Sequence, residues 1–157
     1  MRQEKIRAFG HMTYGIYALT AGFDTVINGM IASWVSQVSY EPPLVMAAVH
    51  PHRYSHSLIE KSGAFVLHVL ERSQKDLLKT FKLPHPENKF SDISWKPGKT
   101  GAPILKNCLA WLEVSVTERH DPGNHTLFIG EVIDAGIPAR GQALSTLDYD
   151  GVYIGKE

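Results

Sequence analysis

The fold of this chain is decided by one stretch, NGMIASWVSQVSYEPP at residues 28–43. A strand that only fills a core alternates β-branched and aromatic residues, and keeps small and hydroxyl residues at its ends. Here Ala32 and Ser33 lie in the middle, where a flat ligand could approach the backbone. Ser36 and Ser39 add further hydroxyl groups that donate and accept hydrogen bonds. The stretch is either a ligand-binding strand or an ordinary edge strand that runs into a Pro-Pro turn.

Length and charge limit the class of protein. The 157 residues suit a single domain with one core, in which we expect residues 1–13 to be a flexible or extended lead. Sixteen basic residues balance sixteen acidic ones, so the chain lacks the positive field that attracts nucleic acid or anionic membranes. Any anion must therefore be held by local groups.

Cysteine content and apolar runs indicate the compartment. Cys108 is the only cysteine, which excludes an internal disulfide and a multi-cysteine metal or iron–sulfur site within one chain. No apolar run approaches the roughly 20 residues of a membrane-spanning helix, and residues 1–5 lack the apolar continuation of a signal peptide. We therefore expect a cytoplasmic protein without a membrane or nucleic-acid partner.

The rest of the chain predicts strands and two short helices. Beyond the opening stretch, strands are predicted at residues 14–20, 44–49, 64–70, 109–118 and 126–135, with 147–154 as a last strand or an arm. Helices are predicted at residues 57–63 and from Ser73, and residues 82–100 as a long loop anchored by Phe90 and Trp95. Without regular βαβ alternation, this pattern predicts an antiparallel barrel with helices at its ends.

A cluster of unusual composition, HPHRYSH at residues 50–56, leads into the first of these helices. We expect Ser55 to be its N-cap. A helix start with free N–H groups and the adjacent Arg53 would bind an anion such as a phosphate. The same residues also fit an ordinary capped helix beside a solvated basic loop.

Zinc is a third interpretation of this cluster. His50, His52 and His56 could supply three nitrogen ligands, but their spacing matches no helical ligand pattern and no carboxylate is nearby. Two other side chains have a simple structural interpretation. His68 lies in an apolar run and is expected to be a hydrogen-bonded core histidine, and Phe81 fits the apolar face of the second helix.

Three separated features can be interpreted together: residues 28–43, the helix start at Ser55-His56, and the turn GNHT at residues 123–126. In this order and spacing the chain resembles the flavin reductase-like family, whose fold is the FMN-binding split barrel. It is most similar to the branch found as flavin domains of diflavin flavoproteins and high-molecular-weight rubredoxins. In that branch a Gly-x-His-Thr turn and a Thr-Gly-Ala-Pro-Ile segment, here residues 100–104, also recur.

The resemblance implies a homodimer that binds FMN near the subunit interface, and it assigns roles to residues. The residues that would line the isoalloxazine ring are Met30, Ile31, Ala32, Ser33, Trp34 and Val35, and Asn28 is a further cofactor-binding residue. Those that would lie toward the ribityl phosphate are Ser39, His50, His52, Arg53, Ser55 and His56. Phe81 and Tyr153 are further implied contacts.

His125 is the candidate catalytic residue, because the family places this turn near the flavin, where His125 could contact the ring or the incoming nicotinamide. Many family members have Asp before this histidine, whereas this chain has Asn124. That difference removes a charge beside His125 and leaves its tautomer and role open.

The implied function is an FMN-dependent oxidoreductase. NADH or NADPH would give a hydride to the flavin, which passes electrons to a flavin, metal, oxygen or a separate acceptor protein; such chemistry needs no protein nucleophile. The chain has no Gly-x-Gly-x-x-Gly fingerprint, so the nicotinamide would bind in an open cleft. An FMN-binding electron relay or carrier without NAD(P)H activity is the alternative. An oligonucleotide-binding barrel is disfavoured by the neutral charge.

Overall fold

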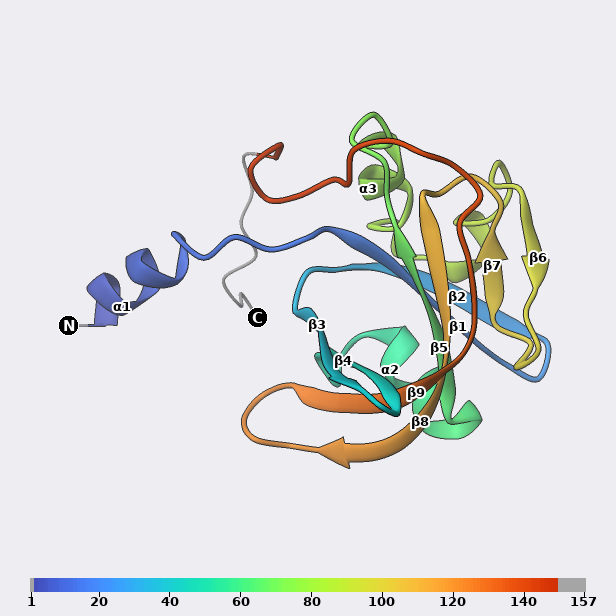
Figure 1. The fold of residues 1–157 in the computed structure, drawn as a ribbon, viewed down its shortest axis with the longest axis horizontal. Coiled ribbons are helices and arrows are strands. Elements are labelled where there is room, and N and C mark those ends of the chain that lie inside the picture. The colour runs from blue at the N-terminus through green and yellow to red at the C-terminus, as the bar shows by residue number, and fades with distance from the viewer. Residues whose placement is uncertain (1, 150–157) are drawn as a thin grey trace.

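The computed structural model describes residues 2–149, and most of its strands form one large sheet (Figure 1). These strands are β1 (Tyr17–Phe23), β2 (Val26–Ala32), β3 (Val35–Tyr40), β4 (Pro43–Val49), β5 (Ala64–Val69), β8 (Ala110–His120) and β9 (Thr126–Gly136). Their order in the sheet is β2-β1-β5-β8-β9-β4-β3, and every neighbouring pair is antiparallel. β6 (Trp95–Pro97) and β7 (Pro103–Leu105) form a separate antiparallel pair. The predicted mainly antiparallel β fold is confirmed.

The helices are short and lie outside the sheet. They are α1 (Arg2–Phe9), α2 (Tyr54–Ser62), α3 (Asp76–Thr80) and the 3-10 helix η1 (Pro86–Asn88). α2 packs against β1 and β2, and η1 lies against β2. α1 stands away from the sheet in Figure 1 and is helical, where a flexible or extended lead was expected. None of the helices within residues 2–149 is long and apolar enough to cross a bilayer.

The stretch at residues 28–43 forms two strands instead of one. β2 ends at Ala32 and β3 begins at Val35, so Ser33 and Trp34 connect them. β2 pairs with β1 and β3 pairs with β4, which places β2 and β3 at opposite ends of the strand order. The expectation of one continuous strand is therefore wrong. We call the place where residues 33–34 cross between the two edge strands the seam.

Two of the three groups of buried apolar side chains among the described residues hold this sheet to α2 and to the α3–η1 segment. Leu58 and Ile59 of α2 pack against Phe65 and Phe128 of the sheet. In the second group, Phe81 and Phe90 attach the α3–η1 segment to the end of the sheet, and Trp95 packs against them. Phe90 and Trp95 thus anchor the long loop as predicted. The loop itself is not fully irregular, since it contains η1 and β6.

His68 is fully buried in β5, and the predicted core histidine is confirmed. Its Nδ1 donates to the carbonyl oxygen of Ala18 at 3.1 Å. Its Nε2 accepts the N–H of Leu105 at 3.0 Å. Both ring nitrogens are therefore used in the neutral form, and burial lowers the pKa of His68 to about 4.

Candidate functional site

A cavity of about 500 Å³ opens at the seam. This volume lies within the range of roughly 300–1,000 Å³ that is typical of small-molecule sites. The end of β2, the two connecting residues, the loop after β4, the α3–η1 segment and the β8–β9 turn all contribute to it. The predicted site residues that line it are Asn28, Met30, Ile31, Ala32, Ser33, Trp34, His50, His52, Arg53, Phe81 and His125.

One wall of the cavity is formed by β2 and the ring of Phe81. A Cβ atom on Gly29 would lie 2.2 Å from Cε1 of Phe81, so only glycine allows the ring to lie this close to the strand. Phe81 in turn packs edge-to-face on Phe90, with ring centroids 5.8 Å apart. The wall is thus fixed by packing from the α3 side and presents a mostly apolar surface to the cavity.

One end of the cavity is basic. Arg53, the N-cap residue of α2, and Lys89 both line it. Lys89 is only 7% exposed, and its Nζ donates to the carbonyl oxygen of Gly29 at 2.9 Å. Burial and the nearby Arg53 guanidinium lower the pKa of Lys89. Among the described residues, no aspartate or glutamate lines this cavity, so its basic end is suited to an anion.

His125 lies beside two other aromatic rings of the cavity. Its ring centroid is 4.6 Å from that of Trp34 and 5.1 Å from that of His50, which it meets edge-on. Its Nδ1 lies 2.8 Å from Oδ1 of Asn124. Burial, His50 and Arg53 lower the pKa of His125 from its ordinary value of 6.5, so the ring is mainly neutral at pH 7.

Four predicted site residues lie outside the cavity lining: Val35, Ser39, Ser55 and His56. Val35 packs against the main core cluster, and Ser39 lies on edge strand β3. The predicted N-cap role of Ser55 is wrong, because the N-cap is Arg53. Ser55 lies in the first turn of α2 and is fully buried, and its Oγ accepts a hydrogen bond from Nδ2 of Asn28 at 2.9 Å. Tyr153 is outside the described residues.

His56 belongs to a network that joins α2 to the β8–β9 turn. Its Nε2 is 2.8 Å from Oγ1 of Thr126, which donates to Oδ1 of Asp121 at 2.6 Å. On the other side, Nδ1 of His56 is 3.4 Å from the carboxylate of Glu60. The network connects the element that carries Arg53 to the turn that carries His125.

The three histidines proposed as zinc ligands do not converge. The side chain of His56 is buried in the network with Thr126, whereas His50 and His52 line the cavity. The backbone N–H of His52 donates to Nδ1 of His50 at 3.2 Å. Within residues 2–149, no three potential ligand side chains are grouped around a possible metal position.

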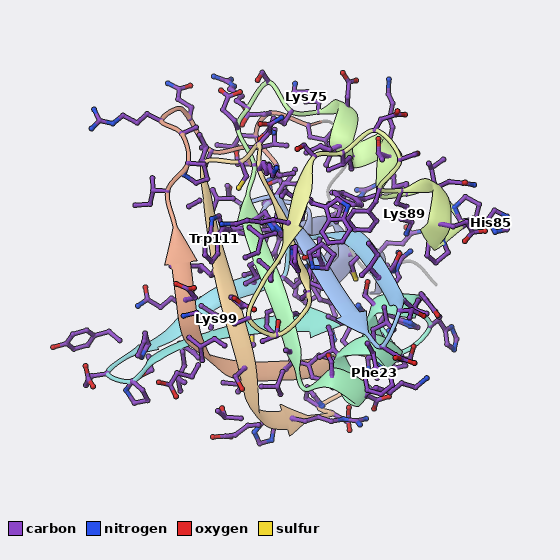
Figure 2. All side chains as sticks on the ribbon, turned by 90° about the vertical axis from the view of Figure 1, so that its right-hand side faces the viewer. Phe23, Lys75, His85, Lys89, Lys99 and Trp111 are labelled. Carbon is purple, nitrogen blue, oxygen red and sulfur yellow. The ribbon has the colours of Figure 1, made fainter. Side chains whose placement is uncertain are left out.

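Lys89 is the main site residue that sequence reasoning missed. Figure 2 shows it beside the η1 segment, whereas His85 points away from the body of the protein. Lysines in a polar loop are normally solvated, so nothing in the composition of residues 82–100 singles it out. One feature of the sequence could have indicated that Lys89 is buried. It precedes Phe90, and a residue that anchors a loop also brings its neighbour toward the core.

Comparison with known proteins agrees with this geometry. The family model described as "Flavin reductase like domain" matches residues 9–155. The chain belongs to the flavin reductase-like family. Its resemblance to this family is confirmed, as is the enzyme class, a flavin reductase.

Relatives in this flavin reductase-like family occur as parts of larger proteins and as single domains. High molecular weight rubredoxin from Moorella thermoacetica is 32% identical over 153 residues, which cover 95% of this chain and 67% of that protein. Diflavin flavoprotein A 1 from Synechocystis is 32% identical over 146 residues, 91% of this chain but only 25% of that protein. A solved NADH:FAD oxidoreductase from Streptomyces globisporus is 31% identical with a TM-score of 0.83, covering 92% of this chain and 87% of that one.

Proposed function

We propose that this flavin reductase binds FMN in the seam cavity and transfers electrons from NADH or NADPH to a flavin, metal, oxygen or protein acceptor. The observation that carries the proposal is the cavity itself, in which a mostly apolar wall ends at Arg53 and Lys89, with Lys82 also in the lining and no carboxylate among the described lining residues. That combination matches a flat aromatic ring attached to a phosphate. The name of the Streptomyces relative, an NADH:FAD oxidoreductase, supports the transfer of electrons from a nicotinamide nucleotide to a flavin.

Each part of the cavity has a distinct task in this proposal. Arg53 and Lys89 hold the phosphate, and residues 30–34 form the surface for the ring, with small side chains at Ala32 and Ser33. When bound, the flavin supplies a hydride acceptor whose electrons can be passed onward. His125 and Trp34 flank the position for the nicotinamide and help to exclude water from it.

A homodimer remains part of the proposal. β3 is an edge strand that exposes apolar side chains, with Val38 49% and Tyr40 84% exposed. Exposed apolar residues on an edge strand are typical of an interface between chains. Sedimentation of the purified protein should give about twice the 17.5 kDa of the chain, and a Val38→Lys, Tyr40→Lys variant should sediment as the monomer.

Anaerobic reduction tests the function directly. The purified protein is loaded with FMN, mixed with NADH or NADPH, and followed at the flavin absorption band. Rapid bleaching supports the reductase, and its rate with each nucleotide gives the preferred donor. Bleaching only by dithionite supports the electron relay instead, and failure to take up FMN contradicts both functions.

A further inference from the structure

A third cation, Lys82, lines the seam cavity apart from the basic end that Arg53 and Lys89 form. It directly follows Phe81 in the α3–η1 segment, and its side chain is exposed. Arg53 lowers the pKa of Lys89, whereas Lys82 is not among the charges that do so. The two lysines are also held by different segments, since Lys89 donates to β2 and Lys82 does not. The cavity therefore offers a second, separate point for an anionic group.

The ammonium group of Lys82 is held by a neutral side chain. Its Nζ donates to the hydroxyl of Tyr149 at 2.8 Å and lies 5.1 Å from the centre of that ring. Within residues 2–149, no aspartate or glutamate forms an ion pair with it. An ammonium group has three N–H donors, so this contact leaves two for a ligand. A phenol positions the charge without neutralising it, and Lys82 thus remains suited to an anion.

Tyr149 has a fixed position of its own. Its neighbour Asp148 forms an ion pair with Arg72, which attaches the backbone at this point. The Tyr149 ring packs against the second group of buried side chains, the group that also attaches the α3–η1 segment. The ammonium group of Lys82 is therefore held at the cavity from two sides.

We propose that Lys82 binds a phosphate group of the nicotinamide nucleotide, and that Tyr149 is a positioning residue that holds its ammonium group in place. This inference rests on the proposed function, in which the phosphate of FMN lies at Arg53 and Lys89. NADH and NADPH share a pyrophosphate, and NADPH adds a 2′-phosphate. Either group is a suitable partner for a lysine.

The exposure of the two lysines assigns them to different ligands. Lys89 is only 7% exposed, and a cation removed from water in this way suits a phosphate that stays bound. Lys82 is exposed, and a nucleotide that must leave after each turnover needs contacts that water can replace. An exposed cation also attracts the anionic nucleotide from solution, an effect that salt screens.

The test is anaerobic single-turnover reduction of FMN-loaded protein over a range of NADH and NADPH concentrations. Lys82→Met keeps the apolar stem and should raise the concentration for half-maximal rate about tenfold, with little change in the limiting rate. Equal effects on both nucleotides assign Lys82 to the pyrophosphate, and an effect confined to NADPH assigns it to the 2′-phosphate. Tyr149→Phe keeps the ring, and it should produce a smaller effect on the same nucleotide.

Lys79→Met is the matched control, because Lys79 is an exposed lysine of α3 outside the cavity lining. It should behave as wild type. Titration of oxidised, FMN-loaded protein with NAD+ or NADP+, followed by the flavin spectrum, should show the same weakening in Lys82→Met without any turnover. Fluorescence titration should give wild-type affinities of Lys82→Met for FMN and for FAD, because the flavin phosphate lies at the basic end.

Unchanged nucleotide affinity in Lys82→Met overturns the inference, and so does an equal loss in Lys79→Met. A loss of FMN or FAD affinity in Lys82→Met also overturns it, because the lysine would then bind the flavin. In each of these cases reduction of the wild-type flavin by a nucleotide still supports the proposed function. If only dithionite reduces the wild-type protein and neither nucleotide perturbs its spectrum, the proposed function and this inference fail together.

Discussion

Lys89 is a lysine whose charge is almost completely removed from water. Within residues 2–149 its Nζ donates a hydrogen bond to the Gly29 carbonyl, and its charged neighbour is the cation Arg53. Such an arrangement is costly without an anion, so we expect both cations to bind the phosphate of FMN. Lys89→Met keeps the apolar stem and should weaken FMN binding by about 1.5–3 kcal/mol, measured by flavin fluorescence titration.

A lysine outside the cavity provides the control for this substitution. Lys75 is the N-cap residue of α3, does not line the cavity, and lies at the edge of the molecule in Figure 2. Lys75→Met should leave FMN affinity unchanged. Equal losses of affinity in Lys75→Met and Lys89→Met would mean that general charge, and not a phosphate contact, governs binding.

His68 should make the stability of the protein depend on pH. The unfolded chain takes up a proton below about pH 6.5, whereas the folded chain resists it until about pH 4, so the unfolded state binds more protons in this window. Stability should therefore fall as pH falls from about 6.5 to 4, by roughly 3 kcal/mol in total from this residue. Urea unfolding across this range measures the slope. His68→Gln, which cannot be protonated, should show a smaller slope; an identical slope would contradict the assignment.

Gly29 should tolerate no side chain. Gly29→Ala would place Cβ 2.2 Å from the Phe81 ring, so the ring must move and the packing of α3 is disturbed. We expect a loss of about 1–3 kcal/mol in unfolding free energy. Gly123→Ala is the matched control, because nothing lies within 4 Å of a Cβ there. If both variants unfold at the same urea concentration, the close contact between Gly29 and Phe81 does not contribute to stability as expected.

At the scale of elements, a carboxylate of β8 helps to hold the turn between β6 and β7 against the sheet. Oε1 of the fully buried Glu113 accepts both the N–H and the hydroxyl of Thr100, each at 2.7 Å. Glu113→Ala should cost about 2 kcal/mol and speed amide hydrogen exchange in residues 97–105. The exposed Glu118 lies on the same strand, and Glu118→Ala should leave this exchange unchanged. Unaltered exchange in Glu113→Ala would show that other contacts hold the pair.

Elements with a strong periodic pattern could be predicted from the sequence. Ten alternating residues at 109–118 predicted β8, and the turn before Thr126 predicted its antiparallel pairing with β9. The break at Ser33 could not be predicted, because it depends on which neighbour each half of the stretch pairs with. The N-cap of α2 was misplaced for a similar reason: the Ser55 hydroxyl is taken by Asn28, which is far away in the sequence.

The same distinction applies to the site. Residues 30–34 could be singled out because their small and hydroxyl side chains are visible locally, and His125 because its turn resembles that of the family; both line the cavity. Lys89 could not be identified from the sequence. Its place in the cavity depends on the packing of Phe90, which brings it to the carbonyl of Gly29. Site residues that belong to a local pattern can therefore be predicted from the sequence, whereas residues that reach the site from a distant segment can be identified only once the fold is known.

At the scale of the whole molecule, the cavity lies where the two edge strands of the sheet are connected by Ser33 and Trp34. A ligand there would contact β2 and Ala48 of β4, and would bind only the folded chain. FMN at about 100 times its dissociation constant should add about 2.7 kcal/mol of stability, visible as a rise in melting temperature. Riboflavin, which lacks the phosphate, is the control and should give a smaller rise; an equal rise would argue against the basic end as the phosphate site.

If FMN binds at the seam as proposed, it should also change how long the protein survives in the cell. Local opening at an unpaired edge precedes cleavage by proteases, and a chain loaded with FMN would open there less often. Under this proposal, the amount of protein that survives would follow the supply of FMN, which is made from riboflavin. Riboflavin shortage would lower the abundance of the enzyme as well as the fraction that is active.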